Sequence, residues 1–139
     1  MFKHIMMPVD LAHADKLDRA MTVAADQAKH YGAKVTYVGV TAATPGSVAR
    51  TPEEYADKLA KLAAAQSELH GHQAESHAVV SHDPAADLDD KLIETRKALG
   101  ADLVVMATHL PNMADMFLPG HGGELARHSQ VSVFLVRPA

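Results

Sequence analysis

The pattern of hydrophobic and polar positions divides the chain into alternating strand-like and helix-like segments. Short apolar runs rich in β-branched residues are typical of buried strands, and the segments between them carry apolar residues at the spacing of amphipathic helices. The pattern predicts strands over 2–9, 34–40, 73–80, 103–107 and 131–136, and helices from residue 13 or 15 to 31, over 51–70, 83–99 and 120–128.

Local signals support the predicted helix ends. Thr51-Pro52 and Asp83-Pro84 each place a capping side chain before a proline at the first helical position. Gly32, Gly71 and Gly100 follow the apolar periodicity as C-terminal caps. The expected inward-facing positions are Leu17, Ala20, Met21, Ala24, Ala28 and Tyr31, then Tyr55, Leu59, Leu62, Gln66 and Leu69, then Leu88, Leu92, Thr95 and Leu99.

Strands that alternate with crossover helices predict a doubly wound parallel sheet with helices on both faces, which is an α/β fold. The run at 103–107 reads as fully buried, and the weakly amphipathic run at 73–80 as an edge strand. A length of 139 residues favours one domain over 1–139.

Composition removes several classes of function. The net charge of −4 argues against binding to nucleic acid or to an anionic membrane surface. The absence of cysteine excludes disulfides and thiol catalysis. No apolar stretch approaches the roughly 20 residues that span a bilayer, and the start of the chain lacks the pattern of a signal peptide. We therefore expect a cytoplasmic protein without membrane insertion.

The expected ligand site lies at the carboxyl ends of the first and fourth predicted strands. The apolar run at 103–107 stops at Thr108-His109, and Asp10 closes the first strand. Ligands of open α/β sheets collect at such ends, where the strand order reverses. We expect residues 107–122 to form half of any small-molecule site, facing Asp10.

Four segments carry a resemblance to a known family: 5–10 (IMMPVD), 31–33 (YGA), 100–106 (GADLVVM) and 131–138 (VSVFLVRP). Together they resemble the universal stress protein family along the whole chain. The resemblance implies a five-stranded sheet in the order 3-2-1-4-5 of the adenine nucleotide alpha hydrolase-like type. It also implies a homodimer built through the last strand, Val131 to Val136, and ATP or AMP bound between strands 1 and 4.

The resemblance also implies individual binding positions. Adenine and ribose would lie against residues at the ends of the first two strands, and phosphates against residues after the fourth strand. The only metal expected is Mg²⁺ accompanying a nucleotide. The implied positions are Pro8, Val9, Asp10 and Val40, then Met106, Ala107, Thr108, His109, Gly120, His121 and Gly122.

The phosphate-binding segment departs from the family pattern. Ala107 and Leu110 stand at glycine positions, and His121 follows the retained Gly120. The isobutyl group of Leu110 would obstruct the approach of phosphate to backbone amides, and residues 110–123 contain no Lys or Arg. The sequence leaves two hypotheses open: a nucleotide-binding regulatory module, or a nucleotide-free dimeric interaction protein whose 110–119 loop closes the cleft.

Other readings of single residues also stay open. For Asp10 the alternatives are a contact with a ligand and a purely structural role as a helix-entry aspartate. For His109 and His121 they are a contact with phosphate and a solvated loop position. The apolar side chains of 113–118 cover the cleft, join a dimer contact or meet a regulatory protein partner.

No spacing of nucleophile, base and orienting group is visible, so we expect no enzyme activity. Several histidines could be considered as metal ligands, but they lie on different elements and lack a zinc-site spacing. We expect no metal site, and we expect these histidines to be exposed polar residues: His70, His72, His77, His82 and His128.

Overall fold

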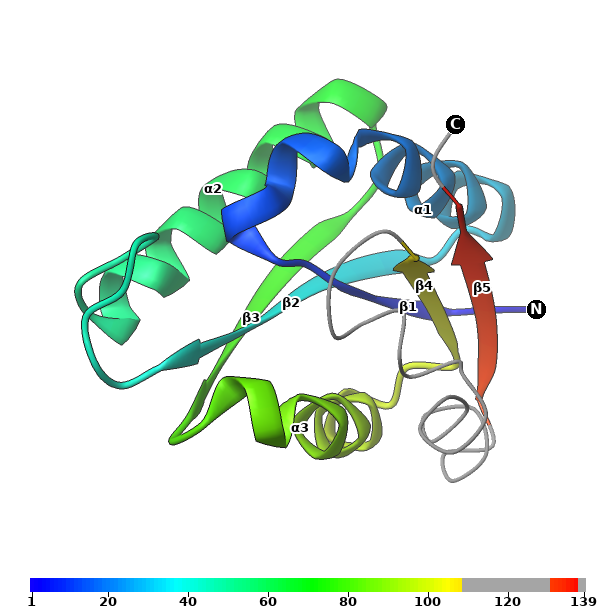
Figure 1. The fold of residues 1–139 in the computed structure, drawn as a ribbon. Coiled ribbons are helices and arrows are strands. Elements are labelled where there is room, and N and C mark those ends of the chain that lie inside the picture. The colour runs from blue at the N-terminus through cyan, green and yellow to red at the C-terminus, as the bar shows by residue number, and fades with distance from the viewer. Residues whose placement is uncertain (109–130, 138–139) are drawn as a thin grey trace.

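The computed structural model describes residues 1–108 and 131–137, and its strands form one parallel sheet in the order β3-β2-β1-β4-β5 (Figure 1). This order and the doubly wound α/β class confirm the sequence-based prediction, including β3 as an edge strand. The strands are β1 (His4–Pro8), β2 (Lys34–Ala42), β3 (Ala74–Ser81), β4 (Leu103–Ala107) and β5 (Ser132–Val136).

Helices cover both faces of this sheet. The chain enters α1 (Asp18–Tyr31) through a short 3-10 helix, η1 (Leu11–Lys16). Figure 1 shows α1 and α2 (Pro52–His70) on one face and α3 (Pro84–Leu99) on the other. No helix in the described part of the chain is long and apolar enough to cross a membrane.

The central strands form the core. Every residue of β1 and of β4 is buried, as expected for parallel strands covered by helices on both sides. From the first face, α1 contributes Met21 and Ala24, its N-cap residue Leu17 is also buried, and α2 contributes Tyr55 and Leu59. The apolar runs of the first and fourth predicted strands therefore correspond to the two buried strands at the centre of the sheet.

The helix ends follow the predicted capping signals. The Thr51 hydroxyl accepts a hydrogen bond from the Glu54 amide at 3.1 Å, and Asp83 caps α3 through the Ala86 amide at 3.3 Å. Gly71 ends α2 with φ of 77°, a left-handed conformation that a residue with a Cβ adopts at a cost. The predicted boundaries of α2 and α3 are confirmed.

Two local predictions were wrong. The α-helix does not begin at residue 13 or 15, because Asp10 caps the 3-10 turn and His13 has non-helical dihedral angles (φ −126°, ψ 28°). Leu69 does not face the core and is 72% exposed. The buried stripe of α2 passes through Tyr55, Leu59 and Ala63, and Leu69 lies beside this stripe in the last turn. The predicted helix 120–128 lies outside the described residues.

The prediction of exposed histidines was also wrong for His72, which is 5% exposed. Its Nε2 shares a hydrogen bond of 3.0 Å with the buried Tyr37 hydroxyl, and its Nδ1 has no partner in the described part of the chain. His77 and His82 are exposed as expected, and His128 lies outside the described residues. No group of three potential metal ligands occurs among residues 1–108 and 131–137.

A second buried histidine lies on the opposite face of the sheet. His4 Nε2 is 2.6 Å from the Thr36 hydroxyl, and Nδ1 is 3.1 Å from the Leu99 carbonyl oxygen. Burial, reinforced by the Lys34 charge, lowers the pKa of His4. Burial also lowers the pKa of His72, with His70 and Lys29 adding to the effect. Both rings are therefore built into the fold in the uncharged form.

Candidate functional site

Strand register brings part of the predicted site together at the carboxyl edge of the sheet. Pro8 pairs with Val38, and the Val9 amide donates to the Val38 carbonyl at 2.8 Å. Val9 and Asp10 therefore continue alongside Val40 as both strands reach this edge. β4 pairs with the other side of β1, so the structure confirms that the strand order reverses beside Asp10.

The β4 positions reach the same edge with different exposure. Met106 and Ala107 are buried, so their side chains belong to the core. Thr108 is half-buried, and its amide donates to the Val136 carbonyl at 3.0 Å. The remaining predicted positions, His109, Gly120, His121 and Gly122, lie outside the described residues, as does Leu110.

Asp10 uses both carboxylate oxygens within its own turn. Oδ1 accepts a hydrogen bond from the Ala12 amide at 3.0 Å and caps η1. Oδ2 lies 2.9 Å from His13 Nδ1. Asp10 is therefore a helix-entry aspartate in this structure, and it also orients a neighbouring imidazole.

Tyr55 was missed by the sequence analysis as a residue of this edge. Its ring packs on Gly39 of β2, where the absence of a side chain makes room for the phenol. Burial, with the Asp10 carboxylate adding to it, raises the pKa of Tyr55 to about 12, which keeps the hydroxyl protonated. A glycine inside a β-branched strand is the signal that could have indicated this close approach.

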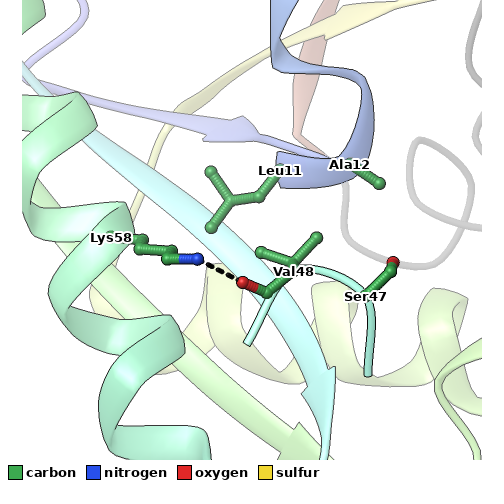
Figure 2. Close-up of a pocket in the computed structure, with 5 residues that line it drawn as sticks. All are labelled: Leu11, Ala12, Ser47, Val48 and Lys58. Atoms are coloured by element: carbon green, nitrogen blue, oxygen red, sulfur yellow. Dashed lines mark hydrogen bonds between the residues drawn. The ribbon is translucent and has the colours of Figure 1, made fainter. Parts of the chain in front are cut away.

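A pocket of about 470 Å³ opens beside Leu11 and Ala12, the two residues that follow Asp10 in the chain (Figure 2). Its walls come from η1, from the segment after β2 and from α2. Figure 2 shows the Lys58 ammonium directed at the Val48 carbonyl oxygen, to which it donates a hydrogen bond. The volume falls within the range of small-molecule sites. The lining residues are Leu11, Ala12, Ser47, Val48 and Lys58.

None of these pocket-lining residues was predicted from the sequence. Pro45-Gly46-Ser47 has the composition of a loop, and no prediction was made for Lys58. Lys58 also lies 3.5 Å from Glu54 Oε1, so its charge is shared between a carbonyl and a carboxylate. The pocket wall is apolar at Leu11 and Val48 and polar at Ser47.

Comparisons with known proteins agree with this architecture. The family model described as the universal stress protein family matches residues 1–137. Universal stress protein G of Shigella flexneri is 27% identical over 150 residues, covering 99% of this chain and 100% of that protein.

Solved structures of low sequence identity share the fold. A universal stress protein from Archaeoglobus fulgidus in complex with dAMP has a TM-score of 0.67 at 18% identity, covering 96% of this chain and 97% of that one. A universal stress protein in complex with cAMP has a TM-score of 0.66 at 20% identity, covering 99% of each chain. The chain therefore belongs to the universal stress protein family.

Proposed function

We propose that this protein is a regulatory module of the stress response that binds an adenine nucleotide at the carboxyl edge between β1 and β4. The observation that carries the proposal is the position of the pocket. Two of its lining residues, Leu11 and Ala12, directly follow Asp10, which stands where the strand order reverses. Two relatives with this fold are described as complexes with cAMP and dAMP, which supports an adenosine monophosphate as the ligand class.

The pocket has the chemistry that a nucleobase requires. Leu11 and Val48 offer apolar surface to a flat ring, and Ser47 offers a hydroxyl at the rim. The base would lie in this pocket, with the sugar beside Asp10 and phosphate toward the segment after β4. The positions implied on β4, Met106 and Ala107, would then contribute backbone groups and not side chains.

AMP is the better candidate than ATP. A triphosphate needs cations or many amide donors, and residues 110–123 supply no Lys or Arg. If ATP does bind, we expect Mg²⁺ to arrive with its phosphates. We propose that the protein acts in the cytoplasm by binding its ligand and a regulatory protein partner, and not by catalysis.

The exposed edge of β5 favours the homodimer implied by the resemblance. Phe134 is a large apolar side chain that is 42% exposed, and its strand pairs only with β4 within the described part of the chain. Pairing of β5 with its copy in a second protomer would cover this side chain. We propose this edge as the dimer interface and treat residues 1–139 as one domain within each protomer.

The first experiment examines nucleotide carried through purification. The chain has no Trp and three Tyr, so bound adenine would dominate the absorbance at 260 nm. The protein is denatured, any released nucleotide is identified by chromatography and mass, and AMP or ATP is titrated into stripped protein by calorimetry. Released or rebinding adenine nucleotide is expected. Clean protein without binding heat would contradict the proposal and favour the nucleotide-free interaction protein.

A further inference from the structure

The Asp10 carboxylate already holds two hydrogen-bond partners. Its two oxygens bond the Ala12 amide at 3.0 Å and the His13 imidazole at 2.9 Å. Each carboxylate oxygen can accept a second hydrogen bond, so Asp10 can also contact a ligand. A second group with free hydrogen-bonding capacity is the imidazole of His13, whose side chain is 41% exposed.

The backbone holds His13 in this position. Its φ of −126° and ψ of 28° interrupt the regular turn of η1 and bring the ring back over Asp10. An ionised carboxylate only accepts hydrogen bonds, so in the uncharged imidazole the proton lies on Nδ1. The second nitrogen, Nε2, is then a hydrogen-bond acceptor, and no partner for it occurs in the described part of the chain.

We propose that His13 contacts the nucleotide, with Nε2 accepting a hydrogen bond from a ribose hydroxyl. Asp10 is a positioning residue that fixes the tautomer of the ring. This inference rests on the proposed function, because it names a contact within that nucleotide site. It assigns His13 a role in selecting ribonucleotides over nucleotides that lack the sugar hydroxyls.

The chemistry favours a hydroxyl over the other groups of the ligand. The apolar walls formed by Leu11 and Val48 suit the base, and the sugar is the next group along the ligand from the base. A sugar hydroxyl donates a hydrogen bond, which matches an Nε2 acceptor. A phosphate oxyanion would instead meet the Nε2 lone pair and the negative charge of Asp10, which both repel it.

The test compares AMP with 2′,3′-dideoxy-AMP by calorimetry at pH 8.5. Wild-type protein should bind AMP more tightly than the dideoxy compound. His13→Ala should weaken AMP binding roughly five- to tenfold, the worth of one hydrogen bond, and leave the dideoxy compound unaffected. His30→Ala is the matched control, since His30 is an exposed histidine near the end of α1.

Asp10→Asn tests whether Asp10 positions the His13 ring for its contact with the nucleotide. Its side-chain oxygen can still cap η1, while its amide group would face the imidazole and move the ring proton to Nε2. AMP affinity should then fall by a similar factor without a change in thermal midpoint. Long-range ¹H–¹⁵N spectra of the ligand-free protein should report the Nδ1–H tautomer in wild type and the other tautomer in Asp10→Asn.

The outcomes distinguish this inference from the proposed function. Absence of AMP binding by wild type would overturn the proposed function, and this contact with it. Wild-type binding with no loss in His13→Ala, or an equal loss for both ligands, would overturn only the role of His13. An Nε2–H tautomer in wild type would also overturn it, because that nitrogen could not accept the sugar hydrogen.

Discussion

The Tyr55 hydroxyl occupies the space that a side chain at Gly39 would require. An ideal Cβ on Gly39 would lie 2.3 Å from Tyr55 Oη and 2.8 Å from Cε1. Tyr55 is 5% exposed, so its ring has little room to move. One glycine in β2 thereby sets how closely α2 approaches the sheet beside the pocket lined by Leu11 and Val48.

Gly39→Ala should destabilise the protein. The new methyl group must displace a buried ring, and overpacking of this kind costs about 1–3 kcal/mol in the free energy of unfolding. Urea unfolding followed by circular dichroism measures this change. Gly46→Ala is the control, because the nearest atom to its ideal Cβ is 3.9 Å away. Equal unfolding midpoints for both variants would contradict the tight fit.

Stability should fall as pH decreases below about 6.5. The folded protein holds His4 and His72 with lowered pKa values, so the unfolded chain binds more protons in this range. The contribution of the two histidines to the free energy of unfolding is therefore fully present above the histidine pKa of the unfolded chain, about 6.5. It is lost as the pH falls toward the pKa values of the folded protein, by at most about 1.4 kcal/mol per pH unit for each histidine. Urea midpoints from pH 8 to 5 check this.

Matched substitutions identify the histidines responsible. His4→Gln and His72→Gln should each flatten the pH dependence, although each also lowers stability at pH 8. His30→Ala, at an exposed position, should leave the slope unchanged. A wild-type midpoint that stays constant between pH 7 and 5 would show that neither buried ring is linked to folding.

Tyr37→Phe should cost about 1–3 kcal/mol, because it leaves the buried His72 ring without its hydrogen bond. Tyr37 is completely buried, so water cannot readily replace the lost hydroxyl. Thermal and urea unfolding measure the loss, with Tyr31→Phe at a half-buried position as the comparison. A loss no larger than that of Tyr31→Phe would indicate that the Tyr37–His72 bond contributes little.

Phe134→Glu should dissociate the proposed homodimer. The charge would be placed on the exposed edge of β5, where a second copy must pack and pair. Light scattering after size-exclusion chromatography gives the mass. Val80→Glu is a close control, because Val80 is 46% exposed on the opposite edge strand, β3. A monomeric wild type, or a dimer that survives Phe134→Glu, would reject this interface.

Lys58→Met should weaken AMP binding several-fold while leaving the fold intact. It removes the hydrogen bond that holds the Val48 carbonyl at the pocket wall. Lys61→Met is the control, since Lys61 is 77% exposed and pairs only with Asp57 one turn earlier, among the described residues. If calorimetry gives the same dissociation constant for both variants, the Val48 segment does not depend on Lys58 for its position.

The sequence alone determined most of the scaffold. Thr51, Asp83 and Gly71 predicted helix ends correctly because the bonds that cap a helix join residues within about four positions of each other. The buried strands could also be predicted from the sequence, since a strand covered on both faces is apolar at nearly every position. The alternation of strand and helix predicted a parallel sheet, and the family resemblance supplied its strand order.

Tertiary structure decided which side chains form the candidate site. Tyr55 meets Gly39, and Lys58 meets Val48, only because α2 packs against β2 and the segment that follows it. The burial of His72 likewise follows from its contact with Tyr37, 35 positions earlier. Helical periodicity and capping signals describe neighbours along the chain, whereas these contacts depend on how closely two packed elements approach each other.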